Sequence, residues 1–206
     1  MKSKRGRALL AITLTSGLAI FAILGYREIF LDGVEDLPER VCEGAVESAT
    51  AAKVLPDTRK VTENSDRGRP GDERIFSCSL KTEEESILLA EARMHNASPD
   101  TWRKFYASSK GGNSVPLPGE VDSLSWPRDA SIYIPCTPPE PEGDSGKQPY
   151  ALIISAEMFS ESRVSGKELR QAVVDFAFQV AERAYRVAEC KERTDFPLAP
   201  PRVTSS

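Results

Sequence analysis

The distribution of apolar and polar positions separates an uninterrupted apolar run near the N-terminus from a long region in which apolar residues recur periodically. The run covers residues 8–26, which are 19 positions without a charged side chain. At a helical rise of about 1.5 Å per residue, this length crosses a hydrocarbon core about 30 Å thick. Residues 8–26 therefore predict a transmembrane helix in a lipid bilayer, and residues 27–35 predict a juxtamembrane linker.

Three later segments have apolar residues at helical spacing. The first runs from Asp36, a suitable N-cap residue, through Ala52. The second starts at Ser98, which is followed by proline and aspartate. The third covers residues 166–193, whose apolar positions share one face at about 100° per residue. These patterns predict one short helix between two longer ones.

Strand patterns occur in two pairs. Residues 74–80 and 87–94 alternate between apolar and polar side chains, and the six residues between them predict a hairpin turn. Residues 132–136 also alternate, whereas residues 150–158 are almost continuously apolar, as expected of a central strand. The intervening segments, rich in polar residues, glycine, serine or proline, predict loops; these are residues 57–73, 107–130 and 137–149.

The order of these elements predicts an α+β fold. We expect a mostly antiparallel sheet of four strands, with helices packed on one face. Residues 36–194 form this domain, residues 195–206 are a flexible tail rich in proline, and residues 1–7 are a short basic tail before the transmembrane helix.

Charge is distributed unevenly along the chain. Residues 1–27 contain five bases and no acid, so residues 28–206 hold 22 Lys and Arg against 31 Asp and Glu, a net charge of −9. A basic flank before the apolar run predicts a cytoplasmic N-terminus and an extracellular C-terminal domain. The acidity of this domain argues against nucleic acid as its partner, because phosphate binding requires a basic surface.

A cleaved secretory signal is the competing interpretation of the apolar run. Signal peptides have apolar regions of about 7 to 15 residues followed by small residues at the cleavage site. Here the run is longer and is followed by Tyr26, Arg27 and Glu28, which is a poor cleavage site. The residues before Cys42 are too charged and bulky for lipidation. An uncleaved anchor is favoured, and both interpretations export the domain.

Four cysteines, an even number, fit an exported domain with disulfide bonds. Cys42 and Cys190 lie on the apolar faces of predicted helices, and Cys78 and Cys136 lie on predicted strands. This arrangement favours the pairs Cys42–Cys78 and Cys136–Cys190, each stabilising the fold by roughly 3 to 4 kcal/mol. The wide cysteine spacing and the single histidine do not form a zinc-ligand pattern, so no metal or other cofactor is predicted.

Catalytic residues are not indicated by any motif. His95 is the only histidine, and no serine, cysteine or acid is placed by sequence spacing to act with it. The acidic run of residues 83–85 lacks the ligand spacing of a calcium loop and fits a solvated turn.

Four aromatic residues are the candidates for an interaction surface. Trp102, Phe105 and Tyr106 share one face of the predicted short helix, and Trp126 lies in a predicted loop. Aromatic side chains dominate interface hot spots, although the helical spacing of the first three favours a role in the core.

The cysteine placement and the order of helices and strands resemble a known group of exported proteins. The segments that carry the resemblance are residues 41–45, 54–56, 76–80 and 132–136. They are similar to the uncharacterised membrane-anchored or lipoprotein-like proteins of Streptomyces and related actinobacteria. The resemblance covers most of residues 38–192 and implies an exported α+β domain. It implies no activity, and this chain lacks the lipidation cysteine of the lipoprotein members.

Two hypotheses about function follow. The first is a non-enzymatic interaction module, anchored in the membrane, that binds an envelope protein or a cell-wall component. The second is a small envelope hydrolase whose site is assembled from scattered residues, using His95 or a pair of carboxylates in a cleft.

Overall fold

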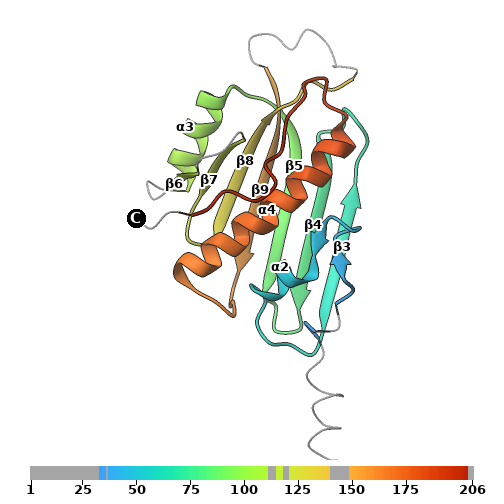
Figure 1. The fold of residues 1–206 in the computed structure, drawn as a ribbon, viewed down its shortest axis with the longest axis vertical. Coiled ribbons are helices and arrows are strands. Elements are labelled where there is room, and N and C mark those ends of the chain that lie inside the picture. The colour runs from blue at the N-terminus through green and yellow to red at the C-terminus, as the bar shows by residue number, and fades with distance from the viewer. Residues whose placement is uncertain (1–32, 36, 111–114, 118–120, 140–148, 204–206) are drawn as a thin grey trace, which may run out of the picture.

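One antiparallel sheet organises the domain, as seen in a computed structural model that describes residues 33–35, 37–110, 115–117, 121–139 and 149–203 (Figure 1). Within these residues the sheet has seven strands in the order β3-β4-β5-β9-β8-β7-β6. The strands are β3 (Val61–Arg67), β4 (Arg74–Thr82), β5 (Ile87–Asn96), β6 (Val115–Leu117), β7 (Asp122–Ser125), β8 (Asp129–Pro135) and β9 (Tyr150–Phe159). The predicted α+β class and both predicted hairpins, β4–β5 and β8–β9, are confirmed.

The prediction of four strands is wrong. β3 lies in the segment 57–73 and β6 and β7 lie in 107–130, all of which were expected to be loops. β3 is an edge strand with five of its seven residues exposed, so it has no apolar alternation to reveal it. Charged and polar side chains are common on edge strands because they discourage pairing with other chains. β6 and β7 have only three and four residues, too few for a periodic pattern.

The two faces of the sheet carry different helices. α4 (Gly166–Ala188) crosses one face diagonally and contacts β4, β5, β8 and β9 (Figure 1). α2 (Ser48–Ala52) packs beside it. α3 (Pro99–Ser109) lies on the opposite face, because its Trp102 packs with Tyr133 and Ile153. The prediction that all helices cover one face is therefore wrong for α3.

A short hairpin replaces most of the helix that was predicted for residues 36–52. β1 (Arg40–Val41) pairs with β2 (Val46–Glu47), and only α2 is helical. The turn between them has left-handed backbone at Cys42 (φ 59°), Glu43 (φ 52°) and Gly44 (φ 77°). A right-handed helix cannot continue through such residues. The apolar spacing of this segment therefore serves the hairpin and α2 rather than one continuous helix.

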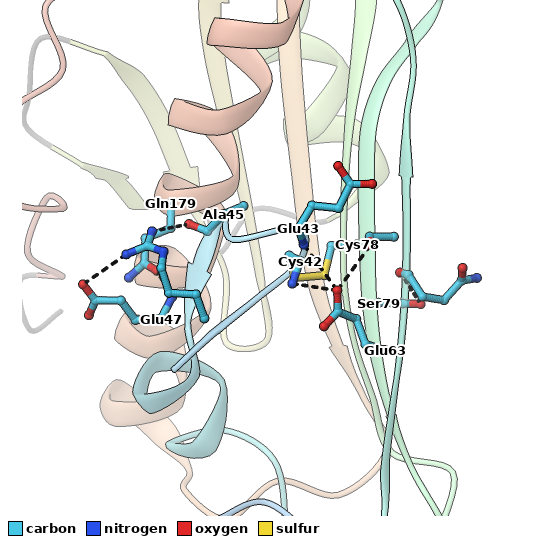
Figure 2. Close-up of a disulfide and its surroundings, with 11 residues drawn as sticks. Cys42, Glu43, Ala45, Glu47, Glu63, Cys78, Ser79 and Gln179 are labelled. Carbon is cyan, nitrogen blue, oxygen red and sulfur yellow. Dashed lines mark hydrogen bonds and ion pairs between the residues drawn. A yellow bond between two sulfur atoms is a disulfide. The ribbon is translucent and has the colours of Figure 1, made fainter. Parts of the chain in front are cut away.

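Side chains from distant elements hold this turn (Figure 2). A carboxylate oxygen of Glu63, on β3, accepts hydrogen bonds from the backbone N–H groups of Cys42 (2.9 Å) and Glu43 (3.3 Å). The side chain of Gln179, on α4, accepts a hydrogen bond from the Glu47 N–H group at 2.7 Å. The bonds to Glu63 satisfy two backbone N–H groups of the strained turn, and the bond to Gln179 satisfies one on β2 beside it.

Both predicted disulfides are confirmed. Cys42 bonds to Cys78 on β4 with a Cα–Cα distance of 5.4 Å. Cys136, directly after β8, bonds to Cys190, just after α4, with a Cα–Cα distance of 4.8 Å. Cys42 reaches its partner from a turn rather than from a helix, so the predicted pairing is correct although the predicted local structure is not.

The segment after α4 folds back along that helix. The Thr194 N–H group donates a hydrogen bond to the Tyr185 hydroxyl at 3.0 Å, and the Val203 N–H group donates one to the Gln171 side chain at 2.7 Å. The Phe196 ring lies against Tyr185, with centroids 5.4 Å apart. Residues 195–203, which the sequence assigns to a flexible tail, therefore pack on α4.

The predicted transmembrane segment, residues 8–26, lies outside the described residues, as do residues 1–7 and most of the linker. Among the residues that the structure describes, no helix is long and apolar enough to cross a bilayer. The anchor therefore stays a prediction from the sequence.

Candidate functional site

The face of the sheet that carries α3 holds the best candidate for a functional site. The Ser98 hydroxyl caps this helix by accepting a hydrogen bond from the Thr101 N–H group at 3.2 Å, and Pro99 follows in the first turn. On the side of α3 that faces the sheet, the indole N–H group of Trp102 donates to the Ser131 hydroxyl at 3.0 Å. The Tyr133 hydroxyl donates to the Ala97 carbonyl at 2.9 Å. These bonds fix α3 against β8.

Aromatic rings fill the space between α3 and the sheet. The Trp102 ring contacts those of Tyr133 and Tyr106, with centroid distances of 5.6 and 6.1 Å. Tyr106 in turn contacts Trp126 at 5.7 Å and Phe105 at 5.2 Å. This cluster is a second, smaller core on the face opposite α4.

A cavity of about 230 Å³, called here the Phe105 cavity, opens beside this cluster. The Phe105 ring, on one wall, is 61% exposed, which is unusual for a large apolar side chain. The remaining lining residues come from the end of β5, the start of α3 and β9; they are His95, Asn96, Ala97, Thr101, Trp102, Tyr106 and Ile153. Most of the lining surface is apolar, and polar side-chain groups come from residues such as His95, Asn96 and Thr101.

A second cavity of about 170 Å³, called here the Lys110 cavity, lies on the other side of Tyr106. The Lys110 ammonium group donates hydrogen bonds to Asp129 and, at 2.9 Å, to Glu157. The Tyr106 hydroxyl hydrogen-bonds with that of Ser155 at 2.5 Å. Burial of Lys110 opposes its positive charge, but the bonds to both carboxylates outweigh this effect and raise its pKa. Lys110 thus ties the segment after α3 to β8 and β9.

The four aromatic candidates from the sequence come together in one place but differ in exposure. Trp102 and Trp126 are only 2% and 3% exposed, so they belong to the second core. Tyr106 is half-buried between the two cavities. Phe105 is the member of the set that is available at the surface. The predicted helical face therefore contains one buried ring, Trp102, and one exposed ring, Phe105.

Each form of the hydrolase hypothesis lacks one requirement in the described part of the chain. His95 is exposed, and no hydrogen bond from its imidazole to a described residue is present. Asp129 and Glu157 are a close acidic pair in a cavity, as the second form requires. The Lys110 ammonium group, however, occupies the space between them, where a catalytic pair would hold the reacting atom. No group of three or more His, Cys, Asp or Glu side chains suited to a metal ion occurs among the described residues.

Sequence reasoning missed the contacts of Lys110 because its partners are distant in the chain. Asp129 lies 19 residues away and Glu157 lies 47 residues away. The two carboxylates meet because Asp129 and Glu157 are directly paired across β8 and β9. This pairing depends on strand register, which apolar alternation alone does not give.

A third cavity, of about 390 Å³, lies at the β3–β4 turn and is lined almost entirely by charged residues. Within it Arg74 pairs with Asp66 at 3.8 Å, and Arg93 pairs with Glu73 at 3.0 Å. Most of its charge is therefore neutralised locally, as in many exposed networks of ion pairs.

Comparison of the chain with known protein families, with curated proteins and with solved structures finds no match. The geometry of the α3 face therefore carries the functional interpretation.

Proposed function

We propose that this chain is a membrane-anchored binding module that acts outside the cytoplasm and catalyses no reaction. Two disulfides support an oxidising, extracytoplasmic environment, because such bonds are rare in reducing compartments. The apolar run at residues 8–26 supports an anchor in the membrane. The observation that carries the binding role is the exposed Phe105 ring beside an open apolar cavity.

Phe105 is held in place before any partner arrives. Its ring packs against Tyr106 at 5.2 Å, and α3 is fixed to the sheet through the buried Trp102. An aromatic side chain on a rigid element loses little conformational freedom on binding, so more of its contact energy contributes to affinity.

The dimensions of the Phe105 cavity indicate the class of ligand. Its volume of about 230 Å³ is below the range of about 300 to 1,000 Å³ that is typical of pockets for drug-sized molecules. Its walls at Ala97, Trp102 and Ile153 are apolar. The cavity therefore suits an apolar side chain from a partner protein.

The charge state of His95 agrees with such a ligand. Although His95 is exposed, the surrounding protein removes part of the water around its imidazole and so disfavours the imidazolium form. Together with the positive charge of Arg93, this desolvation outweighs the attraction of Glu73 and lowers the pKa of His95. Since the ordinary value is about 6.5, the imidazole is neutral at neutral pH. Because His95 is uncharged, an apolar group that binds in the Phe105 cavity does not have to remove water from a charged imidazolium.

Photo-crosslinking from the cavity tests this proposal. A photoreactive amino acid is placed at position 96, an exposed residue of the cavity lining, in the full chain in its native membrane. We expect a discrete protein adduct, and Phe105→Asp should reduce it at least about tenfold, as for a hot-spot residue. The matched control is Leu198→Asp, because Leu198 is also a large exposed apolar residue but lies on the segment after α4.

Two outcomes would overturn the binding role at this surface. One is the absence of any adduct from position 96 at normal protein levels. The other is an adduct that Phe105→Asp and Leu198→Asp reduce to the same extent, because this would show that the Phe105 ring makes no specific contribution.

A further inference from the structure

We infer that the domain stands on the membrane with its β4–β5 turn toward the bilayer and the Phe105 cavity facing away from it. This inference rests on the anchor in the proposed function and adds the direction from which a partner must approach. Three observations support it: where the described chain begins, how long the domain is relative to its tether, and which side chains are exposed at each end.

The chain enters the domain at the end of the sheet where β3 begins. Gly33 lies so close to Thr58, Arg59 and Lys60 that a Cβ atom at Gly33 would be only 2.2 Å from the Thr58 carbonyl oxygen. The Lys60 carbonyl accepts a hydrogen bond from the Glu83 N–H group in the β4–β5 turn at 3.2 Å. The tether therefore reaches the domain beside the β4–β5 turn.

The Phe105 cavity lies toward the opposite end. β5 starts after the β4–β5 turn at Ile87 and runs to His95 and Asn96, which line the cavity. The β3–β4 turn is at the far end of the sheet (Figure 1). The nine residues of β4, which join the two ends, span about 30 Å at roughly 3.4 Å per residue.

The tether is too short to allow the reverse orientation. Seven peptide units separate Tyr26, the last residue of the apolar run, from Gly33. Fully extended, they span at most about 25 Å, and the headgroup layer takes roughly 5 to 8 Å of that length. Less than about 20 Å then remains, which is shorter than the length of β4. If the β3–β4 end rested on the bilayer, Gly33 would lie about the length of β4 above the membrane surface. The tether cannot reach that far.

Exposed side chains disfavour a domain that lies flat. The large apolar side chains exposed in the described part of the chain are Phe105 on α3, Leu198 on the segment after α4, and Phe159 at the end of β9. Phe105 and Leu198 lie on opposite sides, so neither face offers an apolar patch to the lipid. Phe159 pairs with Ile87 beside the β4–β5 turn, at the end that we assign to the bilayer.

The acidic run in the β4–β5 turn limits how closely this end of the domain can approach the lipid. The side chains of residues 83–85 are three exposed glutamates. Burial of their charges in lipid would be costly, so the turn stays in water above the headgroups. The domain therefore stands close to the bilayer without entering it.

Energy transfer to labelled lipids tests the orientation. The full chain is placed in lipid nanodiscs that contain a headgroup acceptor, with a fluorescent amino acid at position 83 or at position 70. Both positions are exposed, the first in the β4–β5 turn and the second in the β3–β4 turn. We expect transfer from position 83 to be several-fold more efficient than transfer from position 70.

Equal transfer from both positions would mean that the domain lies flat, and stronger transfer from position 70 would mean that it is reversed; either result overturns the inference. The anchor is tested separately by co-elution with nanodiscs, in which the full chain is compared with a chain that begins at residue 33. Failure of the full chain to co-elute would remove the anchor and with it the orientation. Failure to co-elute with nanodiscs concerns the anchor alone. The binding role is tested separately, by whether the crosslinked adduct depends on Phe105.

Discussion

One face of the sheet is closed by a helix of 23 residues, whereas the other carries a helix of 11 residues over only part of its width. The burial of residues along the strands reflects this difference. In β5 the first eight residues alternate between half-buried and buried, because only the α4 side is covered. In β9 residues 151–154 are all buried, because α4 covers one side and α3 covers the other. A continuous apolar run thus marks where two layers meet, and an alternating run marks where one face is left open.

The difference between the faces also separates the main core from the surface that we propose for binding. The α4 face contains the main core and both disulfides join elements around it. The α3 face contains a small aromatic core, two cavities and an exposed ring. Variants on the two faces should therefore differ in how much they destabilise the whole domain.

The largest expected effect is on the α4 face. Phe176 is fully buried between α4 and the sheet, so Phe176→Ala removes a large apolar side chain and leaves a cavity. The free energy of unfolding should fall by about 3 to 5 kcal/mol, measured by urea denaturation. The control, Phe105→Ala, should change it by less than about 0.5 kcal/mol, because this ring is exposed. Equal losses of unfolding free energy in the two variants would contradict the expected difference in stability between the two faces.

An intermediate effect is expected from Trp102→Phe on the α3 face. The substitution keeps a ring in the second core but removes the indole N–H group, which leaves the buried Ser131 hydroxyl without its donor. An unsatisfied buried group costs about 1 to 3 kcal/mol. Amide hydrogen exchange should accelerate in α3 while the amides of α4 stay protected.

A double-mutant cycle with Ser131→Ala sharpens this prediction. If the hydrogen bond is responsible, Ser131→Ala should cost less in the Trp102→Phe background than in the wild type. Additive losses, or faster exchange throughout α4, would show that Trp102 acts by packing the whole domain.

The smallest effect is expected from Lys110→Met. Lys110 and Glu157 are each 35% exposed, so solvent screens their interaction and the loss should be about 1 kcal/mol at neutral pH. The control Lys104→Met should cost less, because no ion pair of Lys104 is present among the described residues.

The pH dependence of this loss follows from the raised pKa of Lys110. The folded state binds this proton more tightly than the unfolded state does. Its contribution is therefore complete below the unfolded pKa of about 10.4 and is lost as the pH rises through the higher folded value. Urea denaturation of the wild type and Lys110→Met should give a difference at pH 7 that disappears in strongly alkaline buffer. A difference that persists there would mean that the lysine stem, not its charge, ties α3 to the sheet.

The candidate site could be predicted only in part. The spacing of Trp102, Phe105 and Tyr106 correctly placed them together on α3. It did not show which ring is exposed, because the sheet covers α3 on one side only and the sequence does not reveal that side. Trp126 was predicted to lie in a loop, which left its exposure open; it packs against Tyr106 because the β7–β8 hairpin turns it inward.

What the sequence by itself determined were the local elements and the disulfide pairing. Periodicity along four strands and two helices is a property of neighbouring residues, and it located β4, β5, β8, β9, α3 and α4. Tertiary structure decided the rest. It placed α3 on the second face, extended the sheet to the polar edge strand β3, and turned the chain sharply at Cys42 with the help of Glu63. Each of these depends on contacts between residues far apart in the chain, whose energies a local pattern does not contain.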